Sequence, residues 1–318
     1  MGGESIQALW YMAAGRAELR PESVGEPAPG GVRVRALFGA ISRGTERLVF
    51  RGAVPASQYD RMRAPHMAGA FPFPVKYGYA TVGRVEAGPP ALTGRLVFAL
   101  HPHQSVFTLA AEEVAVLPEQ VPPARAVLAA NMETALNAVW DAAPAPADRI
   151  AVVGGGVMGL RVARRSSRMP GTEVTVVDVA SARAAGSAKR APEGCDLVFH
   201  ASATAAGLAT ALRIAGQEAT VAELSWYGAG EVAAPLGEAF HSRRLRLVSS
   251  QVGEVAPSHR PRWSRGQRLA AALELLADPA LDHVLAPATP FAELPARLAD
   301  LFGGADARCP LIRYSATG

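Results

Sequence analysis

Cysteine is nearly absent from this 318-residue sequence, which contains only Cys195 and Cys309. Two cysteines so far apart, with no Cys-x-x-Cys pair, argue against a disulfide framework and against a structural zinc site built from four cysteines. Lysine is equally scarce, because only Lys76 and Lys189 accompany the arginines that carry almost all of the positive charge. We therefore interpret the formal net charge of +4 as compositional background rather than as a sign of a polyanionic partner.

Long apolar runs and targeting segments are missing too. No stretch reaches the roughly 18 consecutive apolar residues that a membrane-spanning helix needs, and no N-terminal segment joins a basic start to an apolar run. Interleaved basic and aromatic residues, which are typical of nucleic-acid binding, occur only in 259–265. We expect a cytoplasmic protein that binds neither a membrane nor nucleic acid. A hydrophobic fraction of 49% and a charged fraction of 19% indicate ordinary globular domains.

A glycine-rich turn between an apolar strand and a helix is the most informative feature that is present. After the apolar run 150–153 come Gly154, Gly156 and Gly159, in the spacing G-x-G-x-x-G. In such a motif the first glycine makes the turn, the second lets the backbone approach a pyrophosphate, and the third lets helix and strand pack closely. The helix N-terminus then supplies amides for the phosphates. The residues predicted to bind a dinucleotide are Gly154, Gly155, Gly156, Val157, Met158 and Gly159.

A second predicted strand, 173–177, ends in Asp178, about 20 residues beyond the glycines. A carboxylate there accepts hydrogen bonds from a ribose 2′-OH, which favours NAD over NADP. Arg183 is the residue that would permit NADP if it lay beside Asp178 in space. The alternative interpretation is a glycine-rich turn of an α/β protein that binds no ligand.

The pattern of the chain changes at about residue 122. Short β-segments fill residues 1–121, with a long irregular insert at 51–77 that we interpret as a lid or binding wall. A helical pattern follows from Pro122, and strands then alternate with helices, which indicates a parallel, doubly wound sheet. The apolar segment 310–314 is predicted to be a strand that returns to the first domain. The fold class is therefore α/β, with domains at 1–121 plus 285–318 and at 122–284.

Further candidate residues follow predicted strands of the second domain. We expect Ser202 and Ser225 to contact the cofactor, because doubly wound folds bind ligands at the carboxyl ends of their strands. Trp226 and Tyr227 are candidates for the wall of a substrate or nicotinamide pocket, although an aromatic there is nearly as often plain packing. Arginines in 243–246 and 260–265 form either a basic rim for an anionic substrate or a solvated face.

The order of these parts resembles the medium-chain dehydrogenase/reductase superfamily along nearly the whole chain. The resemblance implies a GroES-like β-domain that binds substrate, a Rossmann domain and a homodimer. In the alcohol dehydrogenases of this superfamily, a cysteine-rich turn and a Gly-His-Glu turn hold a catalytic zinc. Here Ser42 stands in place of the cysteine, Tyr79 of the histidine and Ala80 of the glutamate. Glu133 matches a glutamate near the metal, so one candidate ligand remains and the resemblance implies a member without metal.

Among zinc-independent members, the turn 42–46 (Ser-Arg-Gly-Thr-Glu) and the segment 102–104 (Pro-His-Gln) are most similar to hydroxyethyl-bacteriochlorophyllide dehydrogenases and to threonine dehydrogenase-like proteins. This similarity implies an NAD-linked interconversion of a secondary alcohol and a ketone on a small or medium-sized substrate. Two alternatives remain open at this point. One is an NADPH-dependent quinone or enoyl reductase, and the other is a non-catalytic nucleotide-binding protein.

Without zinc, another group must stabilise the alkoxide that develops during hydride transfer. Tyr79 is the predicted proton donor, with its phenol pKa lowered from about 10 by Lys76; the alternative is that Tyr79 only fills the space of the metal. We expect His101 to be structural. The predicted catalytic residues are Tyr79, Lys76, Thr45, His103 and Glu133, and the predicted substrate-binding residues are Ser42, Glu46, Trp226 and Tyr227.

Overall fold

The computed structural model describes residues 6–179, 192–304 and 306–315. The chain forms two compact units, Met1–Ala130 with Leu273–Gly318 (the first unit) and Asn131–Ala272 (the second unit). Residues 122–130 and 273–284, which the sequence assigns to the nucleotide-binding domain, thus belong to the first unit. Arg125 explains part of this difference, because its guanidinium binds the Asp282 carboxylate at 2.7 Å and joins both segments.

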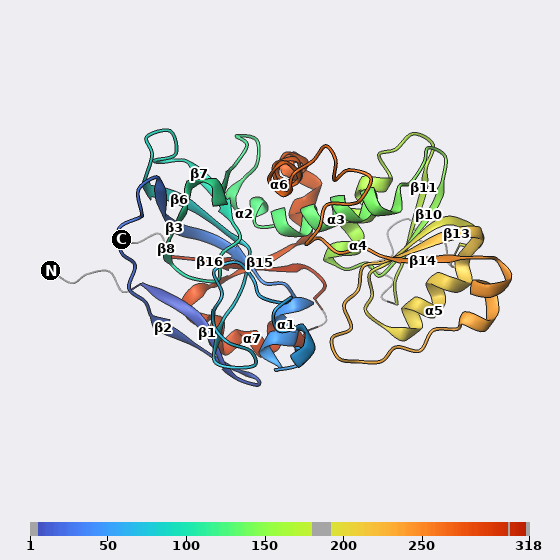
Figure 1. Ribbon diagram of the computed structural model, residues 1–318, viewed down its shortest axis with the longest axis horizontal. Coiled ribbons are helices and arrows are strands. Elements are labelled where there is room, and N and C mark those ends of the chain that lie inside the picture. Colours follow the sequence, from blue (N-terminus) through green and yellow to red (C-terminus); the bar gives the residue numbers. More distant parts are fainter. Residues whose placement is uncertain (1–5, 180–191, 305, 316–318) are drawn as a thin grey trace. The chain divides into compact units, whose positions relative to one another are not determined.

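The first unit contains two sheets, whose strands are blue to green in Figure 1 except for β15 and β16, which come from the red end of the colour bar. The smaller has the strand order β2-β1-β5-β4, and the larger has the order β15-β16-β3-β6-β7-β9 with β8 paired to β3. The strands are β1 (Gln7–Ala13), β2 (Arg16–Pro21), β3 (Gly31–Ala40), β4 (Ala68–Gly69), β5 (Val75–Lys76), β6 (Thr81–Ala87), β7 (Leu96–Ala99), β8 (Val106–Ala110), β9 (Val114–Val116), β15 (Leu285–Pro290) and β16 (Cys309–Arg313). The helices are α1 (Thr45–Phe50), α2 (Pro123–Ala126) and α7 (Leu294–Gly303).

Alternation along β3 explains how this strand builds the core of the first unit. Val32, Val34 and Ala36 are buried, whereas Arg33 and Arg35 between them are partly exposed. Successive side chains of a strand point to opposite faces, so the apolar set faces the core. The predicted return of the C-terminal segment is confirmed, because β16 pairs antiparallel with β3.

The insert 51–77 is more ordered than the sequence predicts. Its end forms the short strands β4 and β5, and β5 pairs with β1 through Trp10 opposite Lys76 and Tyr11 opposite Val75. The expectation of a structureless insert is therefore wrong for this part. Two-residue strands carry too little alternation to be recognised in a sequence, and the β1 partners of β5 lie more than 60 residues away.

The second unit is a parallel sheet with the strand order β11-β10-β12-β13-β14. Its strands are β10 (Arg149–Val153), β11 (Glu173–Val177), β12 (Cys195–His200), β13 (Ala215–Glu223) and β14 (Arg246–Ser249). Its helices are α3 (Ala129–Ala142), α4 (Val157–Ser166), α5 (Ala205–Ile214) and α6 (Arg265–Glu274). The strand order reverses between β10 and β12, and ligands of doubly wound folds bind outside the carboxyl ends of the strands at such a point.

Both faces of this sheet are covered, which makes it doubly wound as predicted. Ala151 and Val153 of β10 pack in one apolar cluster with residues of α5, whose position against the sheet can be followed in Figure 1. Ile150 and Val152 pack in a second cluster with residues of α3 and α4. A strand buried on both faces needs a continuous apolar run, and the run 150–153 provides it. The predicted α/β fold class is confirmed. None of the described helices is both long and apolar enough to cross a membrane.

Candidate functional site

The glycine turn after β10 has the backbone geometry that the sequence predicts. Gly154 has a φ of +111°, and a Cβ at this position would lie 2.7 Å from the Ser202 backbone nitrogen. A Cβ at Gly159 would lie 1.8 Å from the Gly154 carbonyl oxygen. Both positions therefore require glycine, the first for the turn and the second for close packing of α4. A Cβ at Gly156 would meet nothing within 4 Å, so there is open space above the middle of the turn.

Asp178 lies directly after β11 and contacts the glycine turn. Its Oδ2 accepts a hydrogen bond from the Gly155 backbone nitrogen at 2.7 Å. This bond fixes the carboxylate beside the turn, at the carboxyl edge of the sheet. Val157 and Met158 begin α4 and are half-buried, as expected for residues at the rim of the turn. Arg183, which is also a predicted cofactor contact, lies outside the described residues.

Sequence reasoning missed a hydrogen-bonded chain beside Ser202. The His200 imidazole, which is fully buried, lies between two partners: Nδ1 is 2.7 Å from Glu223 Oε2, and Nε2 is 2.6 Å from Ser202 Oγ. Ser202 Oγ is also 3.0 Å from Thr204 Oγ1. A polar signal was available in the sequence, because His200 directly follows the apolar run 197–199 and Glu223 directly follows the apolar run 221–222.

The charge of Glu223 is stabilised by these neighbours. Burial raises the pKa of this carboxyl, but the hydrogen bonds from His200 and from the Ser225 backbone N–H outweigh it and hold the pKa below its usual range. The Tyr227 hydroxyl donates to Glu223 Oε2 at 3.0 Å, and burial together with this carboxylate raises the pKa of Tyr227. Tyr227, a predicted pocket wall, thus hydrogen-bonds this carboxylate.

The other residues predicted at this edge have different surroundings. Ser225 Oγ accepts from the Ala203 backbone nitrogen at 3.0 Å, which joins the turns after β12 and β13. Trp226 is 41% exposed, so a large apolar side chain reaches solvent next to the network. Ser202, Ser225 and Tyr227 therefore share one edge of the sheet, as expected from their positions after strands.

Glu46 is the centre of a buried polar cluster in the first unit. Its side chain is inaccessible to solvent and accepts hydrogen bonds from the Tyr11 hydroxyl at 2.9 Å and from the Ser42 backbone nitrogen at 2.8 Å. The His103 Nε2 lies 2.9 Å from Glu46 Oε2. His103 packs against Gly78, where a Cβ would come within 2.8 Å of the imidazole. The structure therefore joins Glu46 to His103, two candidates 57 residues apart.

Tyr79 belongs to the same cluster. Burial, followed by the negative charge of Glu46, raises the pKa of Tyr79 to about 12, and hydrogen bonds with Ser42 and Thr45 offset part of this rise. The structure thus brings together Ser42, Thr45, Glu46 and Tyr79.

Lys76 does not lower the pKa of Tyr79 in the way that the sequence suggested. Its ammonium donates to Gln104 Oε1 at 2.8 Å and to Glu22 Oε1 at 3.2 Å. The nearest strong charge on Tyr79 is instead the carboxylate of Glu46, which shifts the phenol pKa upward. Lys76 and Tyr79 are only three positions apart in the sequence, but their side chains bind different partners.

His101 has the structural role that we expected. Its ring stacks on Phe107 with centroids 3.9 Å apart and on His66 with centroids 5.4 Å apart. Its Nδ1 donates to the Pro102 carbonyl at 2.9 Å. Burial lowers the pKa of His101 to about 3, so the ring is neutral in the folded protein at ordinary pH.

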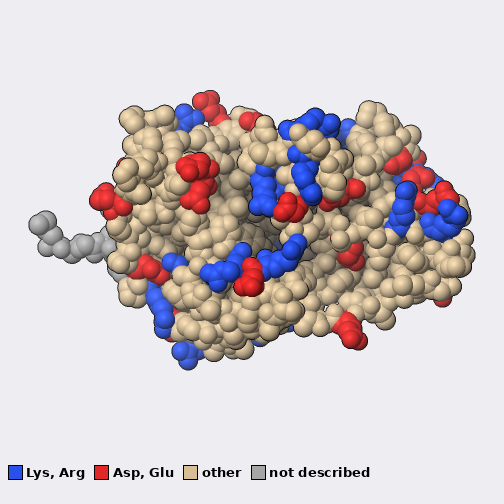
Figure 2. Space-filling view, viewed as in Figure 1, with Lys and Arg blue, Asp and Glu red and all other residues tan. Residues whose placement is uncertain are grey.

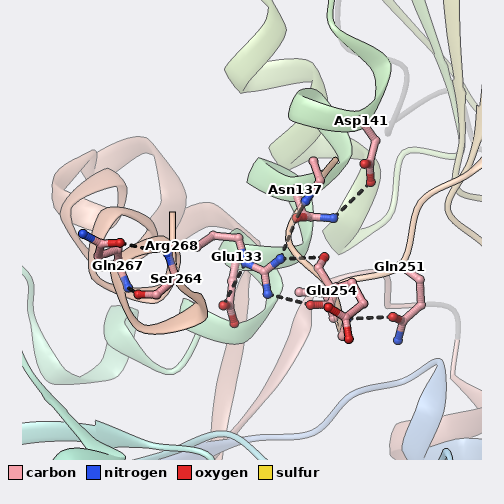
Figure 3. A network of polar contacts seen from close by, with 11 residues as sticks. Glu133, Asn137, Asp141, Gln251, Glu254, Ser264, Gln267 and Arg268 are labelled. Atoms are coloured by element: carbon pink, nitrogen blue, oxygen red, sulfur yellow. Dashed lines mark hydrogen bonds and ion pairs between the residues drawn. The ribbon is translucent and has the colours of Figure 1, made fainter. Parts of the chain in front are cut away.

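Glu133 lies in the second unit and is engaged in a buried ion pair (Figure 3). Its carboxylate binds Arg268 Nε at 3.0 Å, and the Arg268 guanidinium also donates to Asn137 Oδ1 and to the Glu254 carbonyl. Both partners of the ion pair are at least 90% buried. This arrangement favours a structural role for Glu133, and the catalytic role that the resemblance implies stays a prediction.

Among the described residues, no group of three or more His, Cys, Asp or Glu side chains is arranged to hold a metal ion. The groups that act on the pKa of Tyr79 are the Glu46 carboxylate, the Ser42 and Thr45 hydroxyls and the Cys309 thiol. Of these, only the carboxylate and the thiol are zinc donors, and a catalytic zinc site uses three protein ligands.

A cavity of about 520 Å³ opens at the opposite end of the second unit's sheet. It is lined by Glu218, Phe240, His241, Arg244, Leu245 and Arg246. These residues lie near the beginnings of the β14 strand and the parallel part of β13, whereas the glycine turn lies at the strand ends. The cavity is therefore separate from the candidate dinucleotide site.

The arginines expected to form a basic rim are largely engaged. Arg244 pairs with Glu218, Arg265 pairs with Glu254, and Arg243 donates to the Ala215 carbonyl. On the face shown in Figure 2, Lys and Arg side chains are interspersed with Asp and Glu. These contacts favour a solvated arginine face over a rim for an anionic substrate.

No protein-family model and no curated protein sequence matches this chain. Solved structures with the same fold do exist. A putative zinc-binding dehydrogenase from Sinorhizobium meliloti 1021, bound to NADP, superposes with a TM-score of 0.77 at 16% identity and covers 98% of this chain and 100% of its own. An alcohol dehydrogenase from Escherichia coli CFT073, complexed with NADH, has a TM-score of 0.75 at 15% identity, covering 98% and 100%.

Benzyl alcohol dehydrogenase from Acinetobacter calcoaceticus also matches, with a TM-score of 0.75 at 13% identity over 98% of this chain and 100% of its own. At such low identity, these matches show the fold alone. The fold is that of alcohol dehydrogenase-like proteins, with a parallel Rossmann-like sheet and a separate antiparallel sheet.

Proposed function

We propose that the protein is a zinc-independent, NAD(P)(H)-dependent oxidoreductase that interconverts a secondary alcohol and a ketone. The observation that carries this proposal is the glycine turn with the Asp178 carboxylate bonded to the Gly155 amide at 2.7 Å. Turn and acid lie at the carboxyl edge of a doubly wound sheet, where such folds bind nucleotides. Similar folds that contain NADP or NADH support the same cofactor class.

The residues at the turn fit a dinucleotide. The open space above Gly156 accommodates a pyrophosphate close to the backbone, and α4 begins at the next residue, so its first amides and its dipole favour negative charge. Asp178 fits ribose hydroxyls and disfavours a 2′-phosphate, which supports NADH as the preferred form. Ser202 and Ser225 are further contacts in this proposal.

The nicotinamide ring supplies the hydride when the cofactor is bound. The chain must then supply a proton to the carbonyl oxygen, and we assign this task to Tyr79. Its raised pKa keeps the phenol protonated at neutral pH, so the group is a donor rather than a base. Ser42 and Thr45 orient the phenol through their hydrogen bonds, and Glu46 with His103 forms the buried support behind them.

Zinc independence rests on the donor set. Ser42, Tyr79 and Ala80 stand at the positions where zinc-dependent relatives in the resemblance have ligands, and a hydroxyl or a methyl group cannot replace a thiolate, an imidazole or a carboxylate. Asp178 also favours this assignment over an NADPH-dependent quinone or enoyl reductase, since NADPH carries the 2′-phosphate.

Titration calorimetry with NADH and NADPH, a carbonyl panel followed by NADH oxidation, and elemental analysis of the purified protein together test this function. We expect binding of NADH tighter than that of NADPH, turnover with at least one ketone, and less than stoichiometric zinc. Absence of binding to both cofactors, or one zinc per chain, contradicts the proposal. Binding without any turnover supports a nucleotide-binding protein instead.

A further inference from the structure

Three side chains at the carboxyl ends of β12 and β13 form a hydrogen-bonded chain, of which the proposed function uses only Ser202, as a cofactor contact. Glu223 contacts His200 Nδ1 at 2.7 Å, and His200 Nε2 contacts Ser202 Oγ at 2.6 Å. An acid, an imidazole and a hydroxyl in this order are the arrangement by which a serine is activated as a nucleophile. Such a constellation is recognised by its geometry and roles rather than by its sequence spacing.

The protons in this chain can be assigned from the partners. The Glu223 carboxylate can only accept, so His200 carries its proton on Nδ1 and donates it to Glu223. The unprotonated Nε2 then accepts the Ser202 hydroxyl proton. Thr204 Oγ1 accepts from the Gly207 backbone nitrogen at 3.0 Å, so its own hydroxyl proton is free to point to Ser202 Oγ. The Ser202 oxygen is thereby oriented with its proton on the base.

The backbone around Ser202 forms a tight turn that packs closely against the first turn of α5. Ser202 lies in the tight turn between β12 and α5, and Ala203 after it has a φ of +54°, which an L side chain rarely adopts. At Gly207, in the first turn of α5, a Cβ would lie 2.0 Å from Ser202 Oγ and 2.7 Å from His200 Nε2. The hydroxyl and the imidazole therefore occupy the space that glycine leaves on the helix.

The surroundings of Ser202 also leave it accessible to a substrate. His200 behind it is completely buried, whereas Ser202 is partly exposed and Ala203 and Thr204 are exposed. The N-terminus of α5 adjoins this turn, and its partial positive charge favours an oxyanion that develops next to the serine. The base is thus shielded from solvent, whereas Ser202 is partly exposed.

We propose that Ser202 is an activated nucleophile that accepts acyl groups from activated carboxylic esters. The Ser202 oxygen forms a bond to the carbonyl carbon while His200 Nε2 takes the hydroxyl proton. The bond to the ester alkoxide then breaks, and the alkoxide leaves with the proton from His200. Water, deprotonated by the same nitrogen, releases the carboxylic acid and restores the serine. No oxidant or metal takes part.

A fluorophosphonate probe tests the nucleophile on the full chain, because it forms a covalent Ser–P bond and releases fluoride. We expect one label per chain, located on the peptide that contains Ser202 by mass spectrometry. Hydrolysis of 4-nitrophenyl acetate provides the second readout. The label and the ester hydrolysis are expected to disappear in Ser202→Ala, whereas Ser242→Ala, which changes an exposed serine of the same unit, keeps both.

Variants of the base distinguish an activated serine from a merely reactive surface hydroxyl. In His200→Asn, we expect the labelling rate to fall by about 100-fold or more, the usual contribution of a general base. Glu223→Gln serves as the second variant should His200→Asn fail to fold, and its labelling is expected to slow as well. No label on Ser202, a label on another residue, or an equal rate in a folded base variant overturns the proposal.

Discussion

At the scale of single residues, Tyr79 shows how burial and a neighbouring charge together decide the chemistry of a side chain. The sequence suggested a phenol acidified by a lysine, but in the structure burial, followed by the negative charge of Glu46, raises the phenol pKa to about 12. A phenol of this pKa remains protonated across the physiological range. It can therefore donate a proton to a ketone, and it is a poor base for the reverse reaction.

Tyr79→Phe removes the proposed proton donor and little volume. We expect kcat for ketone reduction to fall by about 10²-fold to 10⁴-fold, the range of a general acid. The dissociation constant of NADH is expected to stay within about twofold, since the glycine turn and Asp178 provide the cofactor contacts. Steady-state kinetics and calorimetry measure the two quantities. Unchanged turnover in the variant would remove Tyr79 as the acid.

The pKa of Tyr79 can be measured directly by ultraviolet difference titration of the wild type against Tyr79→Phe. We expect a tyrosinate midpoint near 12. In Glu46→Gln, which removes the negative charge, the midpoint is expected to move down but to stay above the ordinary value of about 10, because burial is the larger cause of the rise. Because the folded pKa lies above the unfolded one, Tyr79 also makes the free energy of unfolding fall as pH rises from 10 toward 12. An unchanged midpoint in Glu46→Gln would show that the Glu46 charge does not raise the pKa of Tyr79.

At the scale of elements, the glycines in the turn from β10 into α4 have different roles. Gly159 allows α4 to pack closely on the strand, whereas Gly156 leaves open space for the proposed pyrophosphate. Gly159→Ala places a Cβ 1.8 Å from a backbone carbonyl, so helix and strand must move apart. We expect a loss of about 1–3 kcal/mol in the free energy of unfolding, as for other overpacked sites. Denaturant unfolding measures it.

Gly156→Ala is the matched variant, because its φ of −78° suits alanine and its Cβ meets open space. We expect unchanged stability and at least a tenfold weaker affinity for NADH, because the methyl group occupies the space assigned to the pyrophosphate. Unchanged NADH affinity in Gly156→Ala would show that the cofactor does not bind at this turn.

The ion pair between α3 and α6 tests whether Glu133 is structural. Arg268→Met leaves a buried carboxylate without its partner, and we expect a loss of about 3–5 kcal/mol. Glu133→Gln keeps an oxygen for Arg268 and is expected to cost less stability and to leave kcat unchanged. A stable Glu133→Gln protein with greatly reduced kcat would restore the catalytic role that the resemblance implies.

At the scale of the whole molecule, the sequence predicted what is local and missed what is long-range. The glycine turn, Asp178 and the alternation of β3 were recognisable because neighbouring residues encode them. The contact of His103 with Glu46 was not, because the partners are 57 residues apart and only the folded first unit joins them. The same reason applies to His200 and Glu223, whose strands become neighbours only in the parallel sheet.

Cofactor binding should raise the thermal stability of the whole chain. A ligand that binds only the folded protein stabilises it by about 2.7 kcal/mol at 100 times its dissociation constant. We expect NADH to raise the melting temperature of the wild type, and NADPH at equal concentration to raise it less, because in the proposed site the Asp178 carboxylate repels a 2′-phosphate. In Asp178→Asn, the carboxylate charge is lost, so the difference between the two cofactors should shrink or reverse. Equal shifts by both cofactors in the wild type would show that Asp178 does not contact the ribose.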